Sequence, residues 1–302
     1  MRIVVYGAGG VGSFYGALLA RAGHDVHFVA RGAQLEAIRA RGIRVASRVI
    51  GEIIVPPVAA SDCARDAGRA DLVLVCVKAQ QTPAILDDLA TVVGEDTIVV
   101  PLQNGVESDE LLASRFGRAR VPAAVVYVGA TVSEPGVVDH VARGLIMIGA
   151  PRGFDAGRLP RVREVLQSTG LPVEISDEIQ KEQWRRLIWN ASFNAVCAVT
   201  QRGPHELLAV PEARALLRGM MREVVAVARA KGVIFAESEA EDQLAYTEKL
   251  PRIRTSMDVD RERGRAMETD ALVGVVVRKG RELGVPTPFS EVLYALLTAI
   301  DA

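Results

Sequence analysis

The chain begins Met1-Arg-Ile-Val-Val-Tyr-Gly7-Ala-Gly9-Gly10-Val-Gly12, a short apolar run that leads directly into the pattern G-x-G-x-x-G. In this pattern the first glycine allows a tight turn, the second lets the backbone approach a pyrophosphate, and the third lets the next helix pack closely on the sheet. The amino end of that helix, expected over residues 11–22, offers free N–H groups to phosphate. The sequence therefore predicts a dinucleotide site; a glycine-rich turn without a ligand is the alternative. The residues of this predicted site are Gly7, Ala8, Gly9, Gly10, Val11 and Gly12.

The second predicted strand, residues 25–30, indicates which dinucleotide is bound. Proteins that prefer NAD usually carry an acid at the end of this strand, where it accepts hydrogen bonds from the ribose hydroxyls. Here the strand ends in Arg31, and Glu36 comes later, inside a predicted helix. A guanidinium pairs with phosphate through two parallel hydrogen bonds and stays charged at any working pH. Arg31 therefore favours NADPH, the alternative being an arginine that only faces solvent.

Length and composition exclude several classes of protein. A chain of 302 residues exceeds the usual size of one domain, so two domains are expected. A hydrophobic content of 49% and a charged content of 24% are typical of a globular protein. The net charge of −1, without a basic stripe, argues against nucleic acid and anionic membranes as partners. No apolar run approaches the length of about 18 residues that spans a bilayer.

The cysteines and the amino terminus give an expectation about location. Cys63, Cys76 and Cys197 are an odd set without metal-like spacing, so no metal is expected and they are interpreted as buried or free thiols in a reducing cytoplasm. The first apolar run is too short for a signal peptide and is assigned to the first strand.

The first half of the chain alternates strands and helices. Apolar runs such as residues 71–77 indicate strands buried on both faces, and hence a parallel sheet covered by helices. Segments 42–58 and 130–141 are interpreted as hairpin-type insertions. The predicted strands are 3–6, 26–30, 72–77, 97–101, 121–128 and 145–149, and the predicted helices between them are 34–40, 83–92 and 109–116.

From about residue 178 the pattern changes to long helical stretches without a convincing strand. The predicted helices are 178–200, 211–231, 237–250, 258–283 and 289–299. We therefore expect an α/β protein: a Rossmann dinucleotide-binding domain over residues 1–176, followed by an all-α domain over residues 177–302.

Polar residues that directly follow the predicted strands are candidates for chemistry, because ligands bind at the carboxyl ends of parallel strands. Lys78 follows the strand that ends at Val77, and Gln103 and Asn104 follow the strand that ends at Pro101. A lysine there can hold a substrate or a phosphate, and an asparagine can bind both a ribose and a substrate hydroxyl. Taken singly, each is as consistent with an ordinary loop residue.

The helical half contains two further groups of polar residues. Arg186, Asn190 and Asn194 recur every four residues among apolar neighbours, so they share one helix face and need partners there. Either hydrogen bonds between helices or a substrate-binding wall accounts for them. Ser256 is expected to cap the next helix. Glu268, three turns into that helix and among other acids, has by itself the pattern of a surface charge.

Together these segments resemble ketopantoate reductase (2-dehydropantoate 2-reductase), over nearly the whole chain. The resemblance implies a Rossmann domain followed by a helical domain like that of 6-phosphogluconate dehydrogenase, with NADPH bound in the cleft between them and a 2-keto acid reduced to a 2-hydroxy acid. The matching residues are 7–12, Arg31, Val77-Lys78, Gln103-Asn104-Gly105, Pro135-Gly136, His140, Trp184, Asn190, Asn194, Ser256-Met257, Glu268-Thr-Asp270 and Gly284-Val-Pro-Thr-Pro288.

The resemblance also implies roles for single residues. Arg31 becomes the contact to the 2′-phosphate, Lys78 a catalytic and cofactor-side lysine, and Asn104 a contact to both nicotinamide and substrate. In the helical domain, Asn190, Asn194 and Ser256 become hydrogen-bond partners of the substrate. Glu268 becomes a partner of the substrate, of the cofactor side or of the catalytic acid, and lies in the cleft.

One position departs from the family pattern. The family's catalytic lysine stands two residues after the tryptophan, and this chain has Arg186 there. An arginine is a poor general acid, but it can polarise a carbonyl or clamp a carboxylate. Lys181 is about 140° away around the helix, so it is not an obvious substitute. Lys78 or water is left to deliver the proton.

The sequence therefore predicts an NADPH-dependent oxidoreductase, most simply one that reduces 2-dehydropantoate to pantoate in pantothenate biosynthesis, with Arg186 binding or polarising the substrate. A paralogous reductase for another keto acid, aldehyde or imine is the first alternative, because Arg186 replaces the lysine. An NADPH-binding sensor without catalysis is the second. Beyond the keto-acid substrate, the expected partner is a second copy of the chain in a homodimer.

Overall fold

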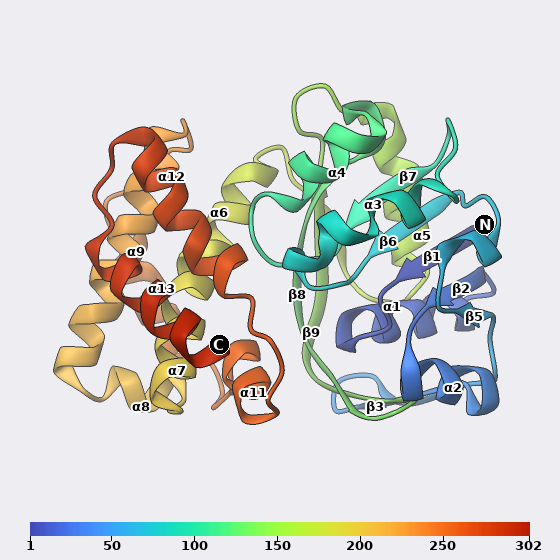
Figure 1. Cartoon of the computed structure of the whole chain (residues 1–302), viewed down its shortest axis with the longest axis horizontal. Coiled ribbons are helices and arrows are strands. Elements are labelled where there is room, and N and C mark those ends of the chain that lie inside the picture. Colours follow the sequence, from blue (N-terminus) through green and yellow to red (C-terminus); the bar gives the residue numbers. More distant parts are fainter. The chain divides into compact units, whose positions relative to one another are not determined.

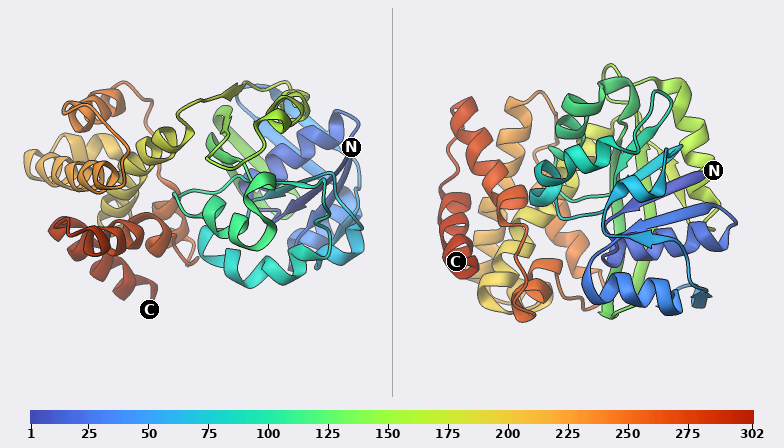
Figure 2. Two further views of the ribbon diagram at one scale, coloured as in Figure 1. Left: turned by 90° about the horizontal axis from the view of Figure 1, so that it is seen from above. Right: turned by 45° about the vertical axis from the view of Figure 1, so that its right-hand side comes forward.

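The structure is a computed structural model that describes residues 1–302. It forms two compact units, Met1–Ile179 and Gln180–Ala302, which are drawn in Figure 1. The first unit contains all the strands, and the second unit is helical, as Figure 2 shows for the yellow-to-red part of the chain. The fold is thus the α/β class that the sequence predicts.

The first unit is built around a parallel sheet with the strand order β5-β2-β1-β6-β7. From β1 the chain runs outward through β2 to β5 and then crosses to β6 and β7 on the other side. The order therefore reverses between β1 and β6, which is where ligands bind in such sheets. The strands are β1 (Arg2–Tyr6), β2 (Asp25–Val29), β5 (Ala60–Ser61), β6 (Leu72–Val75) and β7 (Ile98–Pro101).

Helices cover both faces of this sheet, which explains why its strands are apolar throughout. Ile3 and Val5 of β1 pack toward α1 (Gly10–Arg21), whereas Val4 and Tyr6 pack toward α3 (Thr82–Ala90) and α4 (Ser108–Phe116). The remaining helices of the unit are α2 (Gly32–Arg41), α5 (Leu159–Gln167) and four short 3-10 helices: η1 (Ala64–Ala67), η2 (Ala79–Gln81), η3 (Arg118–Arg120) and η4 (Ala156–Arg158).

A second sheet, not expected from the sequence, lies on the other side of α1. It has the order β10-β9-β3-β4, with β8 paired to β9, and α1 packs against it. The hairpins expected at 42–58 and 130–141 are confirmed, as β3/β4 and as the turn between β8 and β9. Strands 121–128 and 145–149 form, but as the arms of this long hairpin rather than in the parallel sheet. The strands are β3 (Ile43–Ser47), β4 (Gly51–Val55), β8 (Ala123–Glu134), β9 (Val137–Gly149) and β10 (Val173–Ile175).

The second unit differs from the prediction at two helices. The expected helix 178–200 is continuous but contains a π turn, η5. The expected helix 258–283 is wrong: α11 ends at Glu262, and helical structure resumes only at Thr269, where a second π turn, η6, follows. The elements are α6 (Ile179–Trp189), η5 (Asn190–Asn194), α7 (Ala195–Thr200), α8 (Pro204–Leu208), α9 (Pro211–Ala230), α10 (Glu239–Glu248), α11 (Ser256–Glu262), η6 (Asp270–Gly274), α12 (Val275–Leu283) and α13 (Pro288–Asp301).

A buried carboxylate fixes the last helix of this unit. Glu223 of α9 is 7% exposed and accepts hydrogen bonds from the backbone N–H groups of Phe289 and Ser290, at 2.8 and 2.9 Å. The hydroxyl of Ser290 donates to the same carboxylate at 2.6 Å. Glu223 thus satisfies N–H groups in the first turn of α13, which have no partner within the helix.

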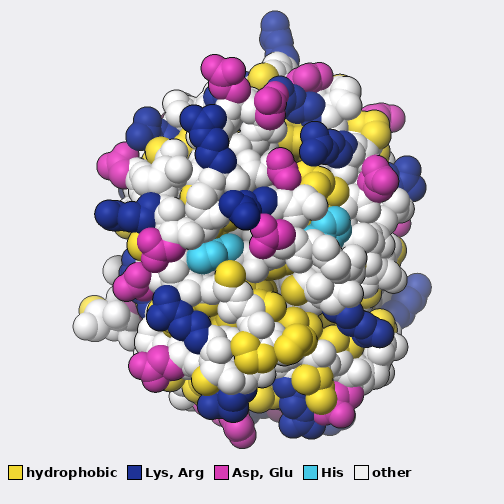
Figure 3. All heavy atoms as spheres, turned by 90° about the vertical axis from the view of Figure 1, so that its right-hand side faces the viewer, with side chains coloured by type: hydrophobic (Ala, Val, Ile, Leu, Met, Phe, Trp, Pro, Cys, Tyr) yellow, Lys and Arg dark blue, Asp and Glu magenta, His cyan; other side chains and the backbone are white.

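The surface agrees with the near-neutral composition. On the face shown in Figure 3, basic and acidic side chains alternate around one gathering of hydrophobic side chains, without a basic stripe. None of the helices is both long and apolar enough to cross a membrane.

Candidate active site

The glycine-rich loop between β1 and α1 has the geometry that a phosphate-binding turn requires. Gly7 has a φ of +102°, and a Cβ there would lie 2.8 Å from the backbone nitrogen of Val77. A Cβ on Gly12 would collide with the carbonyl oxygen of Gly7, so α1 lies close to the sheet. At Gly9, by contrast, a Cβ would meet nothing within 4 Å. The packing of the protein therefore does not require glycine at position 9. The space beside the loop backbone at this position is open.

Gly10 has a role that the sequence did not reveal. A Cβ on Gly10 would collide with the carbonyl group of Ala130, because β8 passes the amino end of α1. This places Ala130 and Thr131 beside the loop, although they are more than a hundred residues away in the chain.

A chain of hydrogen bonds holds the loop in place. The hydroxyl of Ser13 donates to the carbonyl of Ala8 at 2.8 Å, and the amide of Gln34 donates to Ser13 at 3.1 Å. Gln34 in turn accepts from the backbone N–H of Gly136 at 2.9 Å. The Pro135-Gly136 turn thus supports the loop from the second sheet. His140 is also structural: its ring stacks on Phe14 and its two nitrogens bond to Ser47 and to the carbonyl of Arg143.

Arg31 stands at the carboxyl end of β2, exposed, as the N-cap residue of α2. Burial and a hydrogen bond to Asp88 raise the pKa of Tyr6, the last residue of β1, and the positive charge of Arg31 partly offsets this rise. Arg31 therefore lies near the end of β1. One acid, Asp62, also stands nearby, which the sequence did not predict. In the parallel pairing of β2 with β5, Val29 is level with Ser61, so Asp62 comes level with Ala30, just before Arg31.

Lys78 and Asn104 follow neighbouring strands at equivalent positions. Val75 of β6 pairs with Pro101 of β7, so Lys78 and Asn104 each stand three residues beyond a paired position. Both side chains are half-buried. The amide of Gln103 connects the two strand ends, because it donates to the carbonyl of Val77 at 2.8 Å and to the hydroxyl of Thr82 at 2.9 Å. The parallel register therefore brings together the candidates that the sequence placed after strands.

In the second unit, the π turn η5 carries the predicted polar face. Asn190 and Asn194 are both 2% exposed, and Arg186 is half-buried one turn earlier. The guanidinium carbon of Arg186 lies 5.8 Å from the centre of the Trp189 ring, whose own N–H donates to Thr247 at 2.9 Å. A cation over an aromatic face is held electrostatically, so Trp189 helps to orient Arg186. Single-turn π insertions in helices are frequent at functional sites.

Asn194 and Ser256 are in hydrogen-bond contact. The amide nitrogen of Asn194 donates to the Ser256 hydroxyl at 3.4 Å, a long bond, while its buried carbonyl oxygen accepts none. The expectation that Ser256 is the N-cap is wrong. Thr255 caps α11 by accepting from the N–H of Asp258, and Ser256 is the first helical residue, exposed to solvent. Ser256 is thereby released from capping and available to a ligand.

Glu268 is buried, at 7% exposure, and is not the surface charge that its neighbours suggest. It lies not within a long helix but just before one, and its carbonyl accepts from the N–H of Leu272. A carboxylate at this end of a helix is favoured by the helix dipole. The following turn, η6, packs against η5, which carries Asn190 and Asn194.

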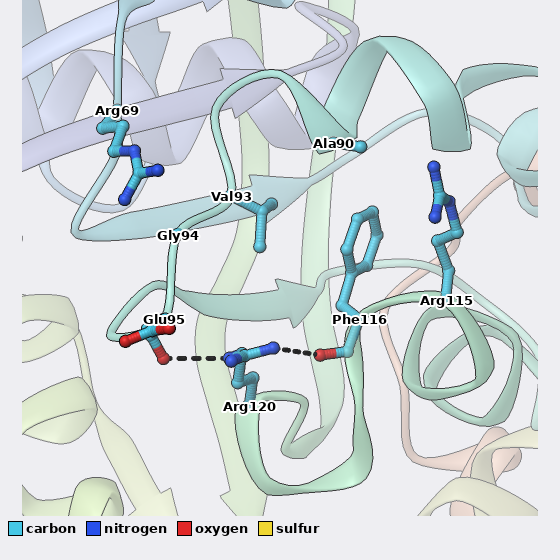
Figure 4. Close-up of a pocket in the computed structure, with 8 residues that line it drawn as sticks. All are labelled: Arg69, Ala90, Val93, Gly94, Glu95, Arg115, Phe116 and Arg120. Carbon is cyan, nitrogen blue, oxygen red and sulfur yellow. Dashed lines mark hydrogen bonds between the residues drawn. The ribbon is translucent and has the colours of Figure 1, made fainter.

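One surface hollow of the first unit is unrelated to these residues. It has a volume of about 310 Å³ and lies near the amino ends of β6 and β7. Figure 4 shows Arg120 between Glu95 and Phe116, to whose carbonyls it donates at 2.9 and 2.7 Å. Ligands of parallel α/β sheets bind at the opposite, carboxyl edge, so we do not assign the active site to this hollow.

Comparison with known proteins identifies the chain's family. A model of the family "Ketopantoate reductase PanE/ApbA" matches residues 3–153, and a model of its C-terminal domain matches residues 178–301. The chain belongs to the ketopantoate reductase family. It is therefore an oxidoreductase that acts on a C=O or CH–OH group, as the sequence predicts.

Individual relatives cover the whole chain. The 2-dehydropantoate 2-reductase of Mesorhizobium japonicum is 36% identical over 98% of this chain and 97% of its own length. That of Archaeoglobus fulgidus is 32% identical over 100% of this chain and 98% of its own length. Among solved structures, a 2-dehydropantoate 2-reductase from Geobacter metallireducens is 34% identical, with a TM-score of 0.93 over 99% of both chains.

Proposed function

We propose that this chain reduces 2-dehydropantoate to pantoate with NADPH, a step of pantothenate biosynthesis. The observation that carries the proposal is the full-length similarity to relatives named for this reaction, the first at 36% identity. A D-mandelate dehydrogenase of the same fold has been solved with NADH, which supports a nicotinamide cofactor only as far as the shared fold goes, because the identity is 22%.

The glycine-rich loop fits a dinucleotide. The open space at Gly9 and the uncapped amino end of α1 suit a pyrophosphate, whose charge the N–H groups and the helix dipole stabilise. In this proposal Arg31 binds the 2′-phosphate, while Lys78 and Asn104 contact the nicotinamide half. A bound nicotinamide would supply hydride to the carbonyl carbon of the substrate.

The second unit supplies groups for a keto acid. Asn190, Asn194 and Ser256 donate hydrogen bonds to substrate oxygens, and the unsatisfied carbonyl of Asn194 accepts one from a substrate hydroxyl. Arg186 clamps the carboxylate or polarises the keto group, because a guanidinium holds its charge in place. When hydride reaches carbon, the oxygen needs a proton, which Lys78 or water delivers. Glu268 is a partner of the substrate or of the group that donates the proton.

A panel of carbonyl substrates tests this proposal. We expect NADPH oxidation with 2-dehydropantoate to exceed that with other 2-keto acids, aldehydes and imines. The presence of Arg186 where the family has lysine favours one rival, a paralogous reductase, for which another substrate would be fastest. Binding of NADPH without turnover of any substrate would instead support a sensor.

Replacement of Arg31 tests the choice of cofactor. We expect the native chain to bind NADPH more tightly than NADH, and Arg31→Ala to narrow that gap by about 1–3 kcal/mol, the scale of a charge-assisted hydrogen bond. Fluorescence titration with both cofactors measures the gap. Arg21→Ala, an exposed arginine at the other end of α1, is the matched control and should leave it unchanged. Equal affinities of the native chain for the two cofactors would contradict the NADPH assignment.

We also propose that two copies associate in the cytoplasm as a homodimer through α13. Four apolar side chains at helical spacing on this helix are 37–58% exposed: Phe289, Val292, Leu296 and Ile300. Such a stripe can pack against its own symmetry mate. Sedimentation velocity should show a dimer that Val292→Asp converts to a monomer, and a monomeric native chain would contradict the pairing.

A further inference from the structure

The side chain of Gln103 links the ends of β6 and β7. Its amide nitrogen donates two hydrogen bonds, to the carbonyl of Val77 at 2.8 Å and to the hydroxyl of Thr82 at 2.9 Å. Val77 precedes Lys78, and Thr82 begins α3. A single side chain that follows β7 thus reaches both sides of the turn that carries Lys78.

The orientation of this amide follows from its partners. Exchange of its nitrogen and oxygen would place two acceptor oxygens, those of Gln103 and Val77, against each other. The amide oxygen is buried and accepts no hydrogen bond. Burial of an unpaired oxygen is costly, so the side chain stabilises the site through its two donated bonds alone.

The Val77–Lys78 segment touches both parts of the candidate cofactor site. The backbone nitrogen and Cγ1 of Val77 each lie 2.8 Å from the place of a Cβ on Gly7, so this segment packs on the glycine-rich loop. At its other end, the N–H of Lys78 donates to the side chain of Gln81 at 3.2 Å. A displaced Val77 carbonyl would therefore move Lys78 and loosen the packing against Gly7 together.

We propose that Gln103 is a positioning residue that fixes Lys78 and the first turn of the dinucleotide loop through the carbonyl of Val77. The inference deepens the proposed function, since it rests on Lys78 facing cofactor or substrate. In this role Gln103 acts as a hydrogen-bond donor, which a side chain without N–H groups cannot replace.

Two variants of the full-length chain test the role. Gln103→Met removes the donors without adding charge, and Gln103→Glu keeps the shape but sets a carboxylate oxygen against the Val77 carbonyl. The first readout is the rate at which an amine-acylating reagent labels Lys78, followed by peptide mass spectrometry. We expect both variants to raise this rate and to weaken NADPH binding by about fivefold, the equivalent of one hydrogen bond of about 1 kcal/mol.

Two controls separate positioning from general stability. Gln167→Met replaces an exposed glutamine at the end of α5, and Thr82→Val removes one acceptor but leaves the bond to Val77. Both should keep the labelling rate and the NADPH affinity within about twofold of the parent, because both leave the bond from Gln103 to the Val77 carbonyl in place. An effect of Thr82→Val as large as that of Gln103→Met would contradict a role through Val77.

The outcomes also separate this inference from the proposed function. Parental labelling of Lys78 and parental NADPH affinity in a folded Gln103→Met or Gln103→Glu protein would overturn the inference. Lys78→Ala with unchanged affinity and turnover would instead overturn the role of Lys78 in the reaction. Because labelling requires no turnover, the positioning of Lys78 is decided by its own measurement.

Discussion

Gly9→Val is expected to abolish saturable binding of NADPH while both units stay folded. A Cβ at position 9 would meet no atom of the protein within 4 Å, so the obstacle that we expect for valine is a ligand on the loop. Its φ of −73° suits valine, and no backbone strain opposes the change. Fluorescence titration with NADPH measures the binding, and a thermal melt of the same sample measures whether the protein stays folded.

Gly12→Val provides the contrasting control. Its Cβ would collide with the carbonyl oxygen of Gly7, so we expect this variant to lower the free energy of unfolding whether or not a cofactor is bound. A Gly9→Val protein that melts as the parent does and still binds NADPH would remove the phosphate-binding role of the loop. A Gly12→Val protein as stable as the parent would contradict the close packing of α1 on β1.

The second large effect is expected at Arg186. Arg186→Ala should lower kcat/KM by about 2–4 kcal/mol of transition-state stabilisation, comparable to the removal of an oxyanion donor. Steady-state kinetics with the best substrate of the panel measures it. Arg185→Ala is the matched control on the same helix. Arg185 pairs with Glu182 and Glu239, so its loss should affect stability rather than turnover. Equal turnover by Arg186→Ala and the parent would make Arg186 a purely structural residue.

The pH dependence of Arg186→Lys distinguishes binding from proton donation. An arginine stays protonated across neutral pH, so the parent should show no ionisation that belongs to position 186. A lysine there can titrate, and the rate should fall as the pH rises above its pKa, because the acid form is lost. If the rate of the parent itself falls at high pH, and Arg186→Lys leaves this fall unchanged, the proton donor is another group, such as Lys78.

Much of the first unit could be predicted because its signals are local. The strand–glycine–helix pattern of residues 1–22 needs no distant partner, and hairpin 42–58 is closed by its own turn. The second sheet could not be predicted in this way. The parallel pairing of Arg44 with Val137 joins residues far apart in the chain, and no local sequence pattern near either residue indicates this pairing. The collision at position 10 likewise involves a residue far away in the chain, Ala130 of β8.

The site residues also divide into those with a local sequence signal and those that depend on distant contacts. Lys78 and Asn104 were found because they directly follow strands, and Arg186, Asn190 and Asn194 because they share a helical spacing. The burial of Glu268 was predicted only through the family resemblance, since its acidic neighbours suggested exposure and the helix break at residues 263–268 carries no proline to mark it. Asp62, level with Ala30 beside Arg31, depends on the pairing of a two-residue strand, β5, which is too short to recognise by pattern.

Transfer of deuterium from NADPH to product tests the central claim most directly. The native chain would be supplied with NADPH deuterated at C4 on the transferring face, together with 2-dehydropantoate, and the product analysed by mass spectrometry. The proposed reaction predicts pantoate with one deuterium on the carbon of the former keto group, and one NADPH oxidised per product. Bound NADPH that is never oxidised, or a product without the label, would contradict hydride transfer by this protein.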